Sequence, residues 1–153
     1  MQIREYNVSD AEMVVKLFVQ TVHSVNAKHY TAAQLDAWAP DTLEAASWCA
    51  PLAQSYTLVA LAGNQLVGFG NLLASDYLDR LYVHRDFQRQ GIATDIASRL
   101  EQQARLLGLH KLKTDASVTA VPFFENRGYV TVRANAVPRR GELLTNYTME
   151  KQL

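Results

Sequence analysis

The residues with the clearest chemical potential form a short polar loop, Gln88-Arg89-Gln90-Gly91-Ile92-Ala93. The loop follows an apolar run at 81–83 and precedes a long helical pattern, so it connects a strand to a helix N-terminus. Unpaired N–H groups and the positive end of the helix dipole meet at such a point and suit an anionic phosphate. Gly91 lets the main chain approach a ligand closely, and Ala93 keeps that approach open. The loop therefore predicts a pyrophosphate-binding site.

Hydrophobic periodicity and turn signals predict the elements that must position this loop. Strands are expected over 3–6, 56–60, 66–72, 77–83, 111–114, 129–134 and 143–149. Helices are expected from a Ser9–Glu12 capping box to about His23, over 31–38, from 41–44 to Pro51, over 92–107 and over 121–127. This order predicts an α+β fold, in the broad α/β class, as a single domain over residues 1–153. We expect one mixed, mostly antiparallel sheet of about six to seven strands flanked by helices.

Composition excludes several classes of function. Fifteen Lys and Arg residues balance fifteen Asp and Glu residues, which argues against a dedicated nucleic-acid binder. The single Cys49 cannot form an internal disulfide, and no Cys/His cluster has zinc-ligand spacing, so no metal site is expected. The N-terminus is too polar for a signal peptide, and no apolar segment is long enough to span a bilayer. We therefore expect a cytoplasmic protein with no nucleic-acid or membrane partner.

Three segments together resemble the GNAT superfamily of acyl-coenzyme A-dependent N-acetyltransferases. The loop over 88–93 is similar to the superfamily's Gln/Arg-x-x-Gly-x-Gly/Ala pyrophosphate loop, and Leu81-Tyr82-Val83-His84 to the strand end before it. Ala120-Val121-Pro122-Phe123-Phe124-Glu125-Asn126-Arg127-Gly128-Tyr129 is similar to the motif A-x-x-F-Y-E-x-x-G-F. The order and spacing of these elements fit over nearly the whole chain. The segments 29–40 and 146–151 also resemble a bacterial subgroup of acetyltransferases.

The resemblance implies a GNAT-like fold with acetyl-coenzyme A (acetyl-CoA) as the acyl donor. Main-chain groups of Leu81 and Val83 would pair with the pantetheine arm, and the loop amides would hold the diphosphate. Ser117 would either hydrogen-bond the arm or help to cap the next helix. The aromatic pair at 123–124 would anchor the core, with one ring beside the pantetheine. The expected cofactor-binding residues are Leu81, Tyr82, Val83, Gln88, Arg89, Gln90, Gly91, Ile92, Ala93, Thr94, Ser117, Phe123 and Phe124.

Catalysis in the superfamily implies direct attack of a neutral amine on the thioester in a ternary complex, which requires a proton acceptor. Asp79 is the first candidate base, because it shares a face of the 77–83 strand with Leu81 by period-two alternation. Asp76 is the second candidate, and a salt bridge of Asp79 with a neighbouring arginine is the alternative role. The usual acid, a tyrosine, aligns with Phe124, so Tyr147, Tyr82 or a water replaces it, or the thiolate leaves unassisted.

The acceptor site is expected in the helix-loop-helix that walls the substrate pocket in the superfamily. The expected acceptor-binding residues are His23, His29, Tyr30, Trp38 and Asp76, although the aromatic ones would also serve as packing residues. Arg139-Arg140 would meet an acidic acceptor or the ribose phosphate, or form a solvated turn. A compact aromatic wall favours a small-molecule amine over a protein lysine or peptide N-terminus. The absent tyrosine also leaves a non-catalytic acyl-CoA sensor as an alternative, and the resemblance is compatible with a homodimer.

Overall fold

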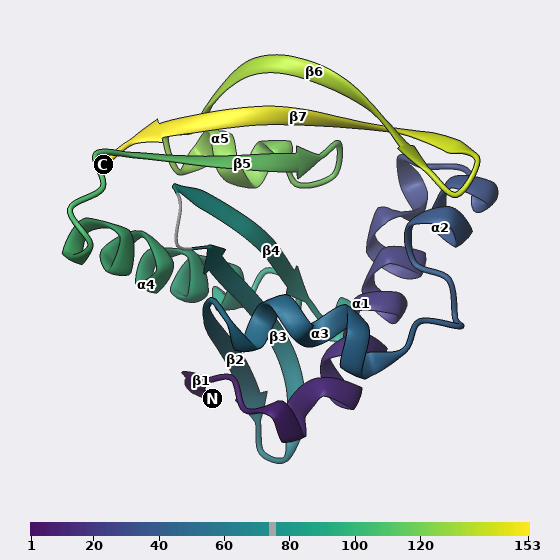
Figure 1. The fold of residues 1–153 in the computed structure, drawn as a ribbon, viewed down its shortest axis with the longest axis horizontal. Coiled ribbons are helices and arrows are strands. Elements are labelled where there is room, and N and C mark those ends of the chain that lie inside the picture. Colours follow the sequence, from purple (N-terminus) through teal and green to yellow (C-terminus); the bar gives the residue numbers. More distant parts are fainter. Residues whose placement is uncertain (74–75) are drawn as a thin grey trace.

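A seven-stranded sheet organises the protein, with strand order β1-β2-β3-β4-β5-β7-β6 (Figure 1). The structure is a computed structural model that describes residues 1–73 and 76–153. All neighbouring strands are antiparallel except β4 and β5, which are parallel. The predicted mixed, mostly antiparallel sheet of an α+β fold is therefore confirmed. The strands are β1 (Gln2–Glu5), β2 (Tyr56–Ala62), β3 (Gln65–Leu73), β4 (Tyr77–Val83), β5 (Lys111–Ser117), β6 (Val130–Arg139) and β7 (Glu142–Gln152).

Helices cover both faces of this sheet. On one face, α1 (Ala11–Val25), α2 (Ala32–Trp38) and α3 (Ala45–Ala53) form an apolar layer with Phe69 and Leu144 of the sheet. On the other face, α4 (Ile92–Leu106) and α5 (Val121–Asn126) pack on Leu112 and Met149. Three short 3-10 helices complete the helical segments: η1 (Val8–Asp10), η2 (Asn26–Lys28) and η3 (Arg85–Phe87). The sheet is thus the middle layer between two hydrophobic cores.

The start of the first helix differs from the sequence prediction. Asn7, not Ser9, forms the capping box: its Oδ1 accepts from Ser9 N (3.1 Å), and Asp10 Oδ2 accepts from Asn7 N (2.8 Å). Asp10 is buried and bound by Arg4 of β1 at 2.8 Å. This ion pair selects the Asn7–Asp10 box over the Ser9–Glu12 box, because it ties the cap to the sheet. Helix α1 consequently begins at Ala11.

Other boundaries agree with the sequence more closely. The predicted capping box of Thr31 and Gln34 opens α2, with the Gln34 N–H donating to Thr31 Oγ1 (3.1 Å). Pro51 was expected to bound α3, but it lies in the last turn of the helix, which runs to Ala53. Strand β5 is longer than predicted, because it pairs with β7 along its whole length, up to Ser117 opposite Asn146.

Strands β4 and β5 pair at one point and then diverge (Figure 1). Among the described residues, their ladder consists of Tyr77 opposite Lys113. On the β3 side, Arg80 lies opposite Asn71, but Leu78 lies opposite Leu72, so Asp79 is an extra residue in β4. Such a bulge bends its strand and increases the local twist. The bulge therefore carries β4 away from β5 and opens a gap in the middle of the sheet.

Helix α4 lies close to β3 because two glycines leave room for it. A Cβ atom built on Gly70 would lie 3.0 Å from Ile96 Cγ2 and 3.0 Å from the Arg80 carbonyl oxygen. A Cβ atom on Gly68 would lie 3.0 Å from Ile92 Cγ2. These contacts are tighter than ordinary packing tolerates, so the glycines set the distance between α4 and the sheet. The same contacts fix Ile92, the first residue of α4, beside the end of β4.

A buried carboxylate joins α4 to the second half of the sheet. Glu101 is 2% exposed and accepts from Arg127 Nη2 (2.8 Å), Lys151 Nζ (2.9 Å) and the Tyr129 hydroxyl (2.9 Å). Burial alone would raise the pKa of Glu101, but the hydrogen bonds from these three donors outweigh it, and the pKa is lowered overall. Folding therefore favours the charged form of Glu101.

This lowered pKa predicts a loss of stability in acid. The stabilisation is complete above the pKa of Glu101 in the unfolded chain, about 4.3, and disappears as the pH falls through its lower pKa in the folded protein. Glu101→Gln should lower the free energy of unfolding at neutral pH by about 3–5 kcal/mol, because it removes a buried carboxylate from two partly buried cations. It should also flatten the acid limb of urea midpoints measured against pH. Glu125→Gln, an exposed control on α5, should match wild type. Parallel acid limbs for the Glu101 variant and wild type would contradict the assignment.

Candidate active site

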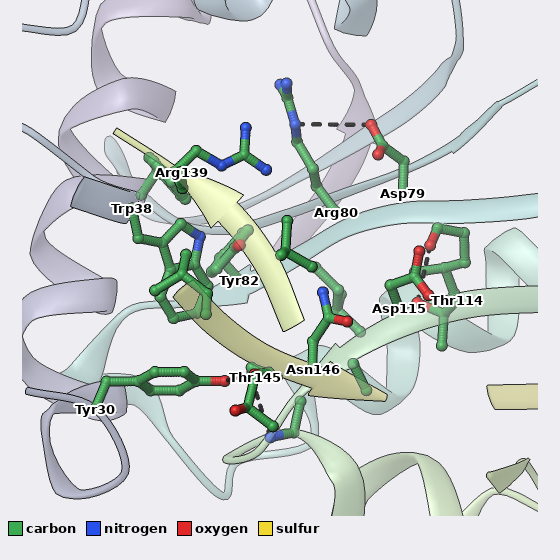
Figure 2. Close-up of a pocket in the computed structure, with 18 of the residues that line it drawn as sticks. Tyr30, Trp38, Asp79, Arg80, Tyr82, Thr114, Asp115, Arg139, Thr145 and Asn146 are labelled. Carbon is green, nitrogen blue, oxygen red and sulfur yellow. Dashed lines mark hydrogen bonds and ion pairs between the residues drawn. The ribbon is translucent and has the colours of Figure 1, made fainter. Parts of the chain in front are cut away.

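The gap between β4 and β5 holds a pocket of about 470 Å³ (Figure 2). Residues 77–82 of β4 and 114–117 of β5 form two of its walls. The helices α1–α3 supply aromatic side chains, and the hairpin of β6 and β7 closes the remaining side with polar and basic residues. A pocket of this volume is typical of a site for small molecules.

Stacked aromatic rings make the wall on the α1–α3 side rigid. Phe18 stacks on Trp48 with ring centroids 4.3 Å apart, and Tyr82 stacks on Phe69 at 5.6 Å. Phe18 also meets the edge of Tyr82 at 5.0 Å. Burial raises the pKa of Tyr82 well above its ordinary value, so its hydroxyl stays protonated at neutral pH.

Asp79 presents a half-buried carboxylate to the pocket from the bulge. Asn71, which is fully buried, holds this bulge in place. Its Nδ2 donates to Asp79 Oδ2 (3.2 Å) and to Ser55 Oγ (3.1 Å), while its Oδ1 accepts from Arg80 N (3.0 Å). Arg80 Nε lies 3.7 Å from Asp79 Oδ2, so the ion pair expected as the alternative role of Asp79 is present, and the same carboxylate lines the pocket.

Arg80 is fixed against the aromatic wall rather than free in solvent. Its guanidinium carbon lies 3.8 Å from the Trp48 ring centroid, and its Nη1 donates to the Trp48 carbonyl oxygen (3.0 Å). A guanidinium carries five N–H donors, so these contacts leave donors available toward the pocket.

Tyr30 and Trp38 lie in the pocket wall, as expected, and pack edge to face with centroids 5.2 Å apart. The Tyr30 hydroxyl is already committed: it donates to the Thr145 carbonyl oxygen (2.6 Å) and accepts from Val118 N (3.0 Å). Burial raises the pKa of Tyr30, and the Val118 N–H partly offsets that rise. Tyr30 therefore ties the helical layer to β7 and offers the pocket its ring.

The structure does not bring four other expected residues into this pocket. His23 Nε2 bonds to the Ala39 carbonyl oxygen (2.7 Å) at a separate surface hollow. His29 Nδ1 bonds to Thr119 Oγ1 (2.7 Å), and Asp76 pairs with Lys113 at 3.9 Å. Tyr147 follows the pocket residue Asn146, but it is only partly buried and packs against the core under α4 and α5. These residues are placed by contacts between elements, which sequence spacing does not reveal.

The predicted phosphate loop lies between η3 and α4, with an exposed surface from Gln88 to Gly91. Arg89 (φ 61°) and Gly91 (φ 84°) both adopt left-handed conformations, which turn the chain sharply into the helix. No side chain caps α4 among the described residues, and its first hydrogen bond runs from Asp95 N to Gly91 O. The N–H groups of Ile92, Ala93 and Thr94 therefore remain available to an anion.

The free edge of β4 leads from this loop to the pocket. Arg80 N and His84 N bond toward β3, so by alternation the main-chain groups of Leu81 and Val83 face the side that β5 has left. The Val83 carbonyl oxygen accepts from Gln88 Nε2 (2.6 Å), which fastens the loop to the strand end. Leu81 thus directs its main-chain groups toward that side, where an extended ligand could pair with them.

Three further cofactor candidates lie on the opposite side of the gap. Phe124 is 3% exposed and lines the pocket, and Phe123 packs against it with centroids 5.2 Å apart. Ser117 also lines the pocket, but its Oγ accepts from Ala120 N (3.2 Å), which is the capping contact that the sequence left as an alternative.

Sequence reasoning missed several polar residues of the site. Asn71 interrupts the apolar run of β3, and that interruption was the signal that could have identified it. Asp115 accepts from the Tyr77 hydroxyl (2.7 Å) and from Thr148, linking β4, β5 and β7 beside the pocket. Burial and the Asp115 carboxylate raise the pKa of Tyr77. A link between three strands depends on sheet order, which local sequence patterns do not show.

Comparisons with known proteins agree with this arrangement. The chain matches the acetyltransferase (GNAT) domain family over residues 26–151. It is 34% identical over 149 residues to the uncharacterized N-acetyltransferase YafP of Escherichia coli strain K12, covering 97% of this chain and 94% of YafP. A GCN5-related N-acetyltransferase from Rhodopseudomonas palustris is 36% identical, with a TM-score of 0.95 over 99% of this chain and 95% of that one. The PaiA N-acetyltransferase of Thermoplasma acidophilum, solved with coenzyme A, shares the fold at 16% identity, with a TM-score of 0.79 over 99% and 98% of the two chains.

The chain therefore belongs to the GNAT acetyltransferase family, as its motifs predicted, and is an N-acetyltransferase. The sheet with its diverging β4 and β5 is the fold of that family. Among the described residues, no helix combines the length and apolar character needed to cross a bilayer.

The two hydrogen bonds from Asn71 to the bulge, one with the Asp79 side chain and one with the Arg80 main chain, form a clamp whose role can be tested. Asn71→Ala should cost about 1–3 kcal/mol in urea unfolding, because it leaves the buried Arg80 N–H without an acceptor. It should also lower kcat more than it weakens acetyl-CoA binding, because it releases the Asp79 carboxylate. Ser55→Ala removes another partner of Asn71 but leaves both bulge contacts, so it is the matched control. Equal effects of the two variants on kcat would show that the clamp does not position Asp79.

Proposed function

We propose that the protein transfers the acetyl group of acetyl-CoA to the primary amine of a small molecule, by direct attack in a ternary complex. The observation that carries this proposal is the divergence of β4 from β5. It leaves a free strand edge that leads from the uncapped N-terminus of α4 to a pocket containing Asp79. Family membership supports acetyl-CoA as the donor, and a fold neighbour from Salmonella typhimurium was solved with acetyl-CoA.

The donor side fits the anionic end of acetyl-CoA. The free N–H groups at 92–94 and the positive end of the α4 dipole would hold the diphosphate, and the exposed Arg89 would add a neutralising charge. Leu81 would pair with the pantetheine arm as an added strand does. Phe124 would contact the arm from the other wall. When bound, acetyl-CoA supplies an activated thioester that an amine can attack with release of the thiol.

Three observations support Asp79 as the proton acceptor on the acceptor side. It lines the pocket, is half-buried, and is oriented by Asn71. Its carboxylate would take the proton that an ammonium must lose before the nitrogen can attack. Among the tyrosines proposed from sequence, Tyr82 lines the pocket, whereas Tyr147 is partly buried against the core and is not among the lining residues. We infer that the departing thiolate takes its proton from Tyr82 or water, or leaves unassisted. Unassisted departure is chemically reasonable because free thiols have a pKa of about 8.5.

The shape of the pocket favours a small acceptor over a protein. Aromatic side chains of the helices and the β6–β7 hairpin close it on two sides. An extended peptide would need an open groove along the strands. We therefore place proteins and peptides second among the acceptors.

Acetyl transfer can be tested by following thiol release from acetyl-CoA with a panel of amines. The panel should contain polyamines, amino acids, aminoglycosides and short peptides, and calorimetry should measure acetyl-CoA binding in parallel. We expect binding together with turnover of at least one small amine. Binding without turnover would favour the sensor alternative that Phe124 suggests, whereas turnover of peptides alone would reverse our preference for a small molecule.

The role of Asp79 can be separated from cofactor binding. Asp79→Asn should lower kcat by about 10²–10⁴-fold, because the amide cannot accept the proton, while acetyl-CoA affinity stays within about twofold. Asp76→Asn tests the second candidate base, which lies outside the pocket and should leave kcat within about twofold. The reverse pattern would assign the base to Asp76. A small effect of both substitutions would leave deprotonation to water.

A further inference from the structure

We propose that the acceptor is a primary amine that also carries a carboxylate, and that Arg139 and Arg80 bind that carboxylate from opposite walls of the pocket. This inference rests on the proposed function and names the class of its substrate. It depends on how the charged side chains of the pocket are distributed and on which of them already have partners.

Basic groups in the pocket outnumber acidic ones. The lining residues include three arginines (Arg80, Arg139 and Arg140) and two aspartates (Asp79 and Asp115), with no lysine or histidine. Figure 2 shows the guanidinium groups of Arg80 and Arg139 pointing into the same part of the pocket. They come from separate elements, β4 and the end of β6, so only the folded protein brings both to one pocket.

Arg139 is the basic group without a partner. Within residues 1–73 and 76–153, no hydrogen bond or ion pair involves its side chain. The neighbouring Arg140 is engaged: its Nη1 donates to the Ala37 carbonyl oxygen (2.7 Å) and tethers the hairpin to α2. Arg140 (φ 44°) and Gly141 (φ 83°) form the tight turn that fixes the end of β6 over the pocket. Arg139 is thus carried by an anchored turn, while its guanidinium remains available.

Arg80 is held where a second guanidinium would be needed. Trp48 fixes it by a stacked contact and a hydrogen bond, and Asp79 accompanies it at 3.7 Å rather than in a close bidentate pair. An anion within reach of both guanidinium groups would accept charge-assisted hydrogen bonds from each of them. A carboxylate matches the planar fork of arginine and accepts two parallel hydrogen bonds from it.

The remaining lining residues indicate how the rest of the acceptor would lie. Asp115 already accepts from Tyr77 and Thr148, whereas Asp79 receives a single 3.2 Å bond from Asn71 in addition to Arg80. The amine would therefore approach Asp79, and the carboxylate would lie toward Arg139. The rings of Trp38 and Tyr82 would contact the carbon skeleton between the two groups. The acceptor would be of amino-acid type, with an amine and an acid in one small molecule.

The test compares L-amino acids with their α-carboxamides as acceptors. The ammonium group of an amino-acid carboxamide has a lower pKa than that of the free amino acid, so more of the carboxamide is present as the neutral amine. Without recognition of the carboxylate, the carboxamide would therefore be the better acceptor. We expect the wild type to prefer the carboxylate in kcat/KM by at least about tenfold. Arg139→Gln should remove this preference through KM and leave kcat/KM for the carboxamide within about twofold. Arg133→Gln, on the same strand but outside the pocket, should behave as wild type.

The possible results separate this inference from the proposed function. Turnover of carboxamides, polyamines or other amines without a carboxylate preference would refute the inference and keep the acetyltransferase assignment. A preference that Arg139→Gln does not change would also refute it. If no amine is turned over, amino acids and carboxamides can be titrated by calorimetry into protein saturated with coenzyme A. Selective binding of amino acids that depends on Arg139 would then support the inference, and equal or absent binding would overturn it.

Discussion

The extra residue at Asp79 is the constraint on which the candidate site depends. Asn71 is fully buried in β3 and bonds to both the Asp79 side chain and the Arg80 main chain, so the bulge has one stable geometry. The bulge bends β4, and its ladder with β5 ends near Tyr77. One local irregularity therefore creates the free strand edge, the pocket and the exposure of the carboxylate. An unbulged β4 would continue beside β5 and close the space.

Specific contacts fix the elements on both sides of this gap. Gly70 lets α4 lie against β3, which fixes the helix N-terminus beside the strand end, and Gln88 fastens the loop to Val83. On the other side, the Tyr30 hydroxyl links the helical layer to the main chains of residues 118 and 145. Different elements thus position the proposed donor and acceptor sides of the site, and Asp79 lies in the pocket between them.

The sequence predicted features that depend on local patterns. The bounds of β4 agree with the prediction, the α4 pattern was correct to within a residue, and the glycine loop led to the right family. The bulge was not predicted, because it depends on a buried amide from another strand, and period-two alternation assumes a regular ladder. His23 and His29 were grouped with the pocket by their neighbourhood in sequence. In the fold, contacts with Ala39 and Thr119 hold both side chains elsewhere.

Within the described residues, a single pairing joins β4 to β5 and divides the sheet into two units, β1–β4 and β5–β7. The hairpin that closes the proposed acceptor side belongs entirely to the second unit, whereas Asp79 belongs to the first and the proposed phosphate loop directly follows it in the chain. Under the proposed function, substitutions in the hairpin would therefore change the choice of acceptor and leave the acyl-donor site intact. Such a division would let related proteins keep the same acetyl-transfer reaction while the acceptor amine changes from one protein to another.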